Sequence, residues 1–141
     1  MYNILVCDDD KEIVEAIEIY LSQEGYKVLK DYDGEEALKL LDKHKVDLLI
    51  IDVMMPRLDG IRATLKIREK QNMPIIILSA KSEDADKILG LNVGADDYMT
   101  KPFNPLELTA RVKSQLRRYT AWKYSGKRES GSLYRGRTYD R

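Results

Sequence analysis

Short apolar runs alternate with amphipathic stretches five times along the chain. The apolar runs predict buried strands at 3–7, 26–30, 47–51, 74–78 and 97–99. In the amphipathic stretches apolar residues recur with helical spacing, which predicts helices over about 11–24, 33–43, 61–70, 82–92 and 104–118. In the first helix the predicted inward stripe is Ile13, Ile17, Tyr20 and Leu21. Five such units predict an α/β fold with a doubly wound, five-stranded parallel sheet and helices on both faces.

Polar residues follow these strands. In strand order, the residues that follow are Asp8-Asp9-Asp10, Asp33, Asp52, Ser79 (before Ala80) and Lys101 (before Pro102). Ligands of open parallel sheets bind at the carboxyl ends of the strands. Carboxylates from the first and third strands, a hydroxyl from the fourth and an ammonium from the fifth can therefore meet in one pocket.

Adjacent carboxylates in one pocket repel each other, which raises some of their pKa values unless a cation joins them. A hard, oxygen-ligated divalent ion, most simply Mg²⁺, resolves that conflict. Asp52 could then act as a nucleophile, while the metal and Lys101 neutralise an incoming phosphoryl group. Taken singly, acids at strand ends often cap helices or turns, Ser79 fits a loop hydroxyl and Lys101 a surface charge. Their joint occurrence at successive strand ends favours the functional interpretation.

Composition narrows the class of protein. The chain has 141 residues, 43% hydrophobic and 34% charged, which suits one compact domain or one domain with a tail. The formal net charge is zero, but residues 120–141 hold six Lys/Arg against two acids, net +4, which leaves −4 for residues 1–119. This Gly- and Ser-containing segment predicts a flexible basic linker or truncated remnant.

The remaining composition points to the cytoplasm. A single cysteine, Cys7, excludes an internal disulfide and a Cys-based zinc site. Cys7 and the paired Met54 and Met55 are expected to be packing residues, and the lone His44 to be solvated. No apolar run approaches the roughly 18 residues of a membrane span. The sequence therefore predicts a soluble cytoplasmic protein.

Four segments together carry a family resemblance. They are 4–9 (ILVCDD), 49–60 (LIIDVMMPRLDG), 78–80 (LSA) and 94–103 (GADDYMTKPF). With them the chain resembles, over residues 3–119, the receiver domain of two-component response regulators. Residues 94–118 resemble the OmpR/PhoB subfamily of transcription regulators in particular. The resemblance implies a flavodoxin-like sheet of strand order 2-1-3-4-5.

The same resemblance implies a role for each strand-end residue. Asp52 would accept a phosphoryl group from a sensor histidine kinase. Mg²⁺ would be held by Asp8, Asp9, Asp52 and the backbone carbonyl of Met54. Lys101 would contact the phosphoryl oxygens and precede a cis bond to Pro102, while Ser79 and Tyr98 would form a switch pair. The chain would be no enzyme beyond catalysing its own phosphorylation and dephosphorylation.

The resemblance also implies a phosphorylation-dependent homodimer. Its face would hold an apolar patch of Ile88, Leu91 and Ala110. Two charge pairs would cross the two-fold axis, Lys87 with Glu107 and Asp97 with Arg111. Asn92 stands where the subfamily commonly has an acid that pairs with Lys113. DNA would be bound only through a further C-terminal domain, for which the 22 residues after Tyr119 are too few.

Two other classes share parts of this pattern. A phosphatase with an aspartate nucleophile needs an acid two residues after the nucleophile, and that position is Met54. A flavodoxin-like nucleotide-binding module would have a Ser-, Thr- and Gly-rich loop after the first strand, where Asp8-Asp9-Asp10 would repel phosphate. Uptake of a phosphoryl group and flavin absorbance discriminate among the three classes.

Overall fold

A computed structural model describes residues 1–55, 58–80 and 94–124. Its elements, in chain order, are β1 (Asn3–Cys7), α1 (Lys11–Gln23), β2 (Lys27–Asp31), α2 (Gly34–Lys43), β3 (Leu48–Asp52), α3 (Gly60–Arg68), β4 (Ile75–Ala80), β5 (Asp97–Lys101) and α5 (Pro105–Tyr124). The helix predicted over 82–92 lies outside the described residues.

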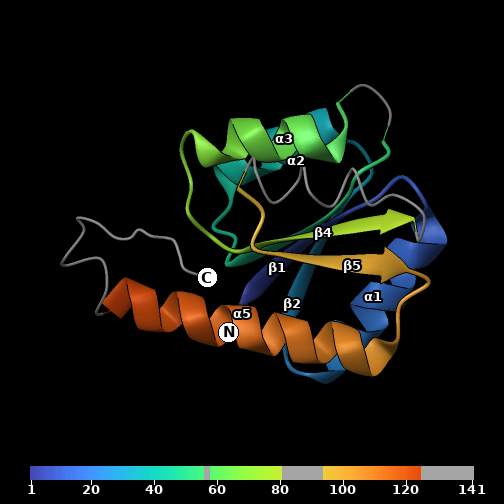
Figure 1. Cartoon of the computed structure of the whole chain (residues 1–141), viewed down its shortest axis with the longest axis vertical. Coiled ribbons are helices and arrows are strands. Elements are labelled where there is room, and N and C mark those ends of the chain that lie inside the picture. Colours follow the sequence, from blue (N-terminus) through green and yellow to red (C-terminus); the bar gives the residue numbers. More distant parts are fainter. Residues whose placement is uncertain (56–57, 81–93, 125–141) are drawn as a thin grey trace.

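The strands form one parallel sheet of order β2-β1-β3-β4-β5, which confirms the predicted fold. Helices α2 and α3 cover one face of this sheet, and α1 and α5 cover the other (Figure 1). All five residues of β3 are buried because helices lie on both of its faces. This burial explains why the strand lacks polar alternation in sequence.

Two buried clusters hold the layers together. The first core cluster joins one face of β1, β3 and β4 to α2 and α3, and includes Leu5, Leu49, Ile51, Ile75 and Ile77. The second core cluster joins the opposite face to α1 and α5, and includes Ile4, Val6, Leu48, Ile50 and Ile76. Each fully buried aliphatic side chain contributes about 1.5–3 kcal/mol relative to an exposed one.

Side-chain caps determine where the helices begin. Asp10 accepts hydrogen bonds from the backbone N–H groups of Glu12 and Ile13, and so caps α1. Asp33 caps α2 through Glu36 N–H. The predicted cap of α5 is present as well, since Asn104 accepts from Leu106 N–H with Pro105 at the first helical position.

The inward stripe of α1 differs from the predicted one. Val14, Ile17 and Leu21 are buried, whereas Ile13 and Tyr20 are only half-buried at the margin of the second core cluster. The apolar residues alone did not define the angle at which α1 faces the sheet. The Asp10 cap marks the start of α1, and the turn after this helix contains Gly25, whose φ of +90° only glycine adopts readily.

Helix α5 continues beyond its predicted end near Arg118 and reaches Tyr124. Residues 120–124 were predicted to belong to the linker and are instead helical. Tertiary contacts explain the difference: Tyr119 packs against the first core cluster, and Thr120 hydrogen-bonds Tyr2. Among the helices described, none combines the length and apolar character that a membrane span requires.

Candidate functional site

Asp8, Asp52 and Lys101 meet at the carboxyl end of the sheet. The Lys101 ammonium lies 2.8 Å from Oδ2 of Asp8 and 2.9 Å from Oδ1 of Asp52. Asp8 is fully buried and Asp52 is 4% exposed, while the Lys101 side chain is 22% exposed. The strand-end residues predicted to share a pocket from β1, β3 and β5 are therefore in contact.

The strand register produces this meeting. Asp52 is the last residue of β3 and pairs with Leu78 of β4, and Ala80 of β4 pairs with Lys101 of β5. Both β4 and β5 run further than predicted, so Ser79 and Lys101 lie inside the strands rather than after them. The Lys101–Pro102 bond is cis, as the family resemblance implied.

Backbone contacts fix Asp52. Its Oδ2 accepts a hydrogen bond of 3.0 Å from Met54 N–H. The next residue, Val53, donates its N–H to Leu78 O and accepts from Gly60 N–H. A Cβ at Gly60 would overlap the carbonyl oxygen of Asp52, so only glycine lets α3 start this close to the end of β3. The sequence alone did not predict this role for Gly60.

The cluster of Asp8, Asp52 and Lys101 holds two carboxylates but only one ammonium. Burial raises the pKa values of Asp8 and Asp52, and Lys101 partly offsets that rise. The negative charge of Asp8 raises the pKa of Asp52 further. Burial alone would lower the pKa of Lys101, but its contacts with the two carboxylates outweigh burial and raise it. One ammonium thus faces two buried carboxylates, which favours a further cation.

Asp9 completes a set of oxygen donors. One carboxylate oxygen from each of Asp8, Asp9 and Asp52 lies within 4.8 Å of the others, with Asp9 exposed at the rim. Oδ2 of Asp8 is buried beside the Lys101 ammonium, 2.8 Å away, and accepts no backbone N–H from the residues that the structure describes. Asp10, by contrast, is occupied as the cap of α1 and does not join the cluster. Three hard carboxylates fit a small divalent ion such as Mg²⁺.

The predicted switch residues occupy neighbouring strands. Ser79 is 1% exposed, and its hydroxyl donates to the Ala80 carbonyl at 3.3 Å. It follows Leu78, the strand partner of Asp52. Tyr98 is half-buried and packs against the first core cluster. Their placement is compatible with the predicted switch, whose movement stays a prediction.

The packing predicted for the sulfur-containing residues is only partly right. Cys7 is buried, burial raises its pKa, and its Sγ lies 3.4 Å from Sδ of Met55. Met54 is 68% exposed, so its prediction as a packing residue was wrong. In the loop after β3 its backbone N–H donates a hydrogen bond to Oδ2 of Asp52, while its side chain extends into solvent.

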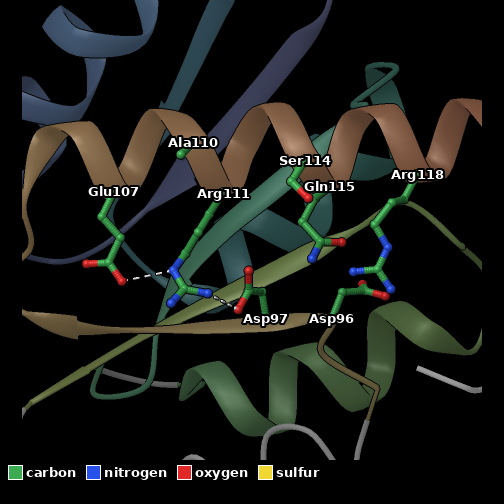
Figure 2. Close-up of a pocket in the computed structure, with 8 residues that line it drawn as sticks. All are labelled: Asp96, Asp97, Glu107, Ala110, Arg111, Ser114, Gln115 and Arg118. Carbon is green, nitrogen blue, oxygen red and sulfur yellow. Dashed lines mark hydrogen bonds and ion pairs between the residues drawn. The ribbon is translucent and has the colours of Figure 1, made fainter.

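The predicted dimer face borders a groove of about 520 Å³ between β5 and α5 (Figure 2). Its lining includes Asp97, Glu107, Ala110 and Arg111. Within this single chain Arg111 lies 2.7 Å from Asp97 and 3.0 Å from Glu107. The pair predicted to cross a two-fold axis is therefore already formed inside one chain. Lys87, Ile88, Leu91 and Asn92 lie outside the described residues.

Lys113 also has a partner that was not predicted from the sequence. Its ammonium lies 2.9 Å from Oε1 of Glu24, at the end of α1. The two residues are far apart in sequence, and no motif connects them. Only the packing of α1 beside α5 brings them together.

Comparison with known proteins identifies one family. The sequence model of the response regulator receiver domain matches residues 4–113. The chain is 52% identical over 126 residues to the regulatory protein VanR of Enterococcus faecium, covering 89% of this chain and 54% of VanR. It is 53% identical over 116 residues to the alkaline phosphatase synthesis transcriptional regulatory protein PhoP of Bacillus subtilis, covering 82% of this chain and 48% of PhoP. The chain thus spans about half the length of these relatives.

Solved structures agree with this assignment. The receiver domain of the Francisella response regulator 1452 matches with a TM-score of 0.79 and 42% identity, covering 84% of this chain and 99% of that one. DrrB, a Thermotoga maritima OmpR/PhoB homologue, matches with a TM-score of 0.76 and 38% identity, over 84% and 54%. The receiver domain of the sensor histidine kinase PA1611 from Pseudomonas aeruginosa, solved with a magnesium ion in its active-site cleft, matches with a TM-score of 0.75 and 31% identity, over 82% and 97%.

Proposed function

The chain belongs to the response regulator receiver domain family, in its OmpR/PhoB branch, and we propose that it is a switch activated by phosphorylation of Asp52. The observation that carries the proposal is the contact of one ammonium, on Lys101, with both Asp8 and Asp52. This arrangement holds an anionic nucleophile beside a positive charge at the open end of the sheet. It suits transfer of a dianionic phosphoryl group.

The proposed reaction is a simple displacement at phosphorus. An oxygen of Asp52 forms a bond to the phosphorus, while the bond from phosphorus to a kinase histidine nitrogen, or to the acyl oxygen of a small donor, breaks. The leaving group keeps the electron pair, and Asp52 becomes an acyl phosphate. Lys101 stays as the ammonium, since its raised pKa keeps it protonated, and it neutralises part of the incoming charge.

Mg²⁺ is the cofactor that the donor set fits best. Asp8, Asp9 and Asp52 would hold it, with the backbone carbonyl of Met54 as a fourth ligand. Bound there, it would supply further positive charge to the phosphoryl oxygens. The magnesium ion in the related PA1611 receiver domain supports this choice.

The proposed consequence is a change in the face formed by β5 and α5. The Ser79 hydroxyl would turn from the Ala80 carbonyl toward a phosphoryl oxygen, and Tyr98 would move inward. A homodimer would then form through this face, with Arg111 exchanging its own Asp97 for that of a second chain. Because Arg111 is already paired within the chain, exchange gains little by itself. Dimerisation should therefore depend on phosphorylation.

The wider role is inferred from the relatives. VanR and PhoP are named as regulatory proteins, PhoP of transcription, and each is about twice as long as the matched segment. We infer that a sensor histidine kinase supplies the phosphoryl group in the cytoplasm, and that a C-terminal domain beyond this chain binds DNA. Met54 stands at the acid position that the phosphatase alternative needs, and Asp8-Asp9-Asp10 stand where the nucleotide-binding alternative needs a Ser-, Thr- and Gly-rich loop.

Intact-mass measurement after incubation with acetyl phosphate and Mg²⁺ tests the proposed function. The parent should gain one phosphoryl group, Asp52→Asn none, and chelation of the metal should stop the reaction. Asp33→Asn is the matched control, because asparagine caps a helix as well as aspartate does. Equal labelling of Asp52→Asn and parent would refute the assignment.

Sedimentation tests the proposed dimer. Beryllofluoride with Mg²⁺ should convert a micromolar monomer toward a dimer, and Arg111→Glu should weaken that dimer. Adding Asp97→Arg should restore part of it. A dimer that tolerates Arg111→Glu unchanged would reject this interface while leaving phosphorylation of Asp52 intact.

A further inference from the structure

The last turns of α5 carry an aromatic arrangement that the phosphorylation site does not use. The family match ends at residue 113, yet α5 remains helical for eleven residues more, to Tyr124. Tyr, Thr and Trp are only moderate helix formers, and they supply four of the six residues from Tyr119 to Tyr124. Local propensity therefore does not explain why the helix continues, and tertiary contacts must hold it.

Tyr119 supplies the central contact. Its ring stacks on the ring of Trp122, with centroids 5.7 Å apart and planes inclined by 19°. The Lys123 ammonium lies 5.7 Å from the centroid of the same ring. Since Trp122 and Lys123 follow at three and four residues, they lie on the same side of the helix as Tyr119. Trp122 and Lys123, in the final turn of α5, therefore both contact the Tyr119 ring.

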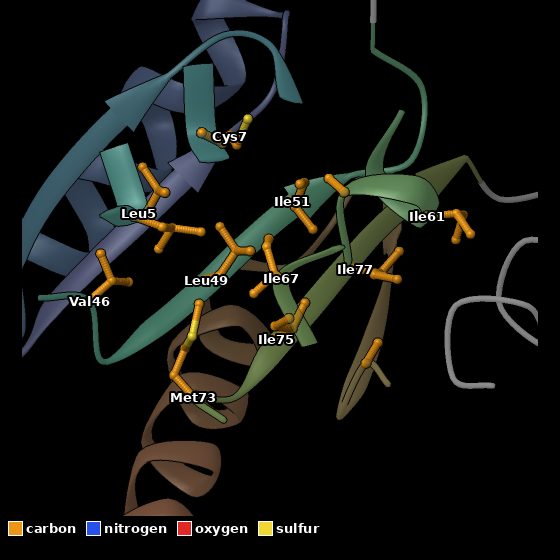
Figure 3. Close-up of a cluster of buried hydrophobic side chains, with 14 of the residues drawn as sticks. Leu5, Cys7, Val46, Leu49, Ile51, Ile61, Ile67, Met73, Ile75 and Ile77 are labelled. Atoms are coloured by element: carbon orange, nitrogen blue, oxygen red, sulfur yellow. The ribbon is translucent and has the colours of Figure 1, made fainter. Parts of the chain in front are cut away.

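Tyr119 also contacts a different core cluster from the rest of α5. The buried side chains earlier in α5, which include Leu108, Val112 and Leu116, belong to the second core cluster. Tyr119 instead packs against the first core cluster, on the side of α2 and α3. In Figure 3 the labelled Met73 lies at the end of this cluster nearest the α5 ribbon. Burial raises the pKa of the Tyr119 phenol, and the nearby charge of Asp47 adds to that rise.

A second contact fastens the same turn to the start of the chain. The hydroxyl groups of Tyr2 and Thr120 lie 3.0 Å apart. The Tyr2 ring in turn meets Tyr26 edge-on, with centroids 6.3 Å apart. The final turn of α5 is therefore tied to the residue before β1 as well as to the first core cluster.

We propose that Tyr119, Trp122 and Thr120 form a lock that fixes the end of α5 to the body of the domain, so that α5 moves as one unit through Tyr124. The lock converts a change on the β5–α5 face into a displacement of the helix end. This second step rests on the proposed phosphorylation of Asp52, whereas the lock itself does not. Arg118, which lines the β5–α5 groove, directly precedes Tyr119, so the groove and the lock share one helical turn.

Hydrogen exchange of the 141-residue chain tests the lock without phosphorylation. In the parent, amides of 119–124 should be protected to a degree similar to those of 108–116. Tyr119→Ala should reduce protection of 119–124 roughly tenfold and leave 108–116 nearly unchanged. Tyr119→Phe keeps the ring and should retain protection, and exposed Arg117→Gln on the same helix is the matched control. Equal protection of 119–124 in the parent and Tyr119→Ala would overturn the lock.

Fluorescence tests the coupling, because Trp122 is the single tryptophan of the chain. Beryllofluoride with Mg²⁺ should change Trp122 emission in the parent and in Arg117→Gln. The change should disappear in Tyr119→Ala, although fluorine NMR still detects beryllofluoride bound to each protein. An undiminished change in Tyr119→Ala, or bound beryllofluoride without any change in the parent, would overturn the coupling. Failure of beryllofluoride to bind would count against the proposed function instead, and hydrogen exchange would still decide the lock.

Discussion

Replacement of Lys101 by methionine is the most direct test of the charge arrangement in the site. At 2.8 and 2.9 Å, and with an effective dielectric constant of about 20, each carboxylate attracts the ammonium by roughly 6 kcal/mol. Desolvation of the three groups and repulsion between Asp8 and Asp52 offset much of that attraction. Removing one partner of a buried ion pair typically lowers the free energy of unfolding by about 3–5 kcal/mol. Because Lys101 is partly exposed, we expect Lys101→Met to lose about 3 kcal/mol, at the lower end of that range.

Urea unfolding of Lys101→Met in metal-free buffer at neutral pH measures this loss. The midpoint should fall while the denaturant slope stays constant, because the surface exposed on unfolding hardly changes. Lys30→Met is the control: Lys30 forms an exposed pair with Glu18 at 3.0 Å, and its removal should have little effect. Mg²⁺ should stabilise Lys101→Met more than the parent, since the ion replaces the missing cation.

The pH dependence of Lys101→Met has a defined sign. Asp8 and Asp52 have folded-state pKa values raised above the ordinary 3.8, and loss of the ammonium raises them further. Between 3.8 and the raised values the folded state binds more protons than the unfolded state, so the free energy of unfolding falls as pH rises. Acidification from neutral pH toward this window should thus recover part of the lost stability. A loss below about 1 kcal/mol, or one independent of pH, would refute the reasoning.

Two further substitutions probe the surroundings of Asp52. Met54, two residues after Asp52, is 68% exposed, and its side chain cannot orient water by hydrogen bonding. The acyl phosphate should therefore persist for minutes to hours. Met54→Asn should shorten that lifetime, whereas Leu65→Asn, at an exposed position on α3, should not. Intact-mass measurement monitors the loss of the phosphoryl group. Loss from the parent within seconds would contradict the predicted lifetime. Gly60→Ala should cost about 1–3 kcal/mol and slow phosphorylation, because its Cβ would overlap the Asp52 carbonyl. Gly25→Asn is the control for the rate: its φ of +90° should lower the stability, but the open space around its Cβ lies away from Asp52, so phosphorylation should keep the parent's rate.

Local pattern alone determined the order of the elements and the membership of the site. Apolar runs such as 48–51, which lack polar alternation, are typical of strands in a covered parallel sheet, so β3 could be predicted without coordinates. Polar residues directly after such strands must then lie at one edge. For this reason Asp8, Asp52 and Lys101 could be assigned to one pocket from their positions in the chain.

The ends of the strands, and which side of α1 faces the sheet, could not be predicted accurately from the sequence. Ser79 and Lys101 are polar and suggested that their strands had ended, but hydrogen bonding across the sheet carries β4 past Ser79 and β5 as far as Lys101. The Asp10 cap sets the start of α1, and packing against the sheet buries Val14 more fully than Ile13. Such outcomes depend on competition between local preference and packing.

Contacts between distant segments were decided only by the tertiary structure. Arg111 pairs with Asp97 inside one chain, and Lys113 pairs with Glu24, because α5 packs beside both β5 and α1. The end of α5 is the clearest case. The composition after residue 119 predicts a linker, yet the Tyr119 ring reaches the opposite core cluster and keeps the helix intact to Tyr124. Side-chain burial against residues remote in sequence supplies free energy that no local window of the chain contains.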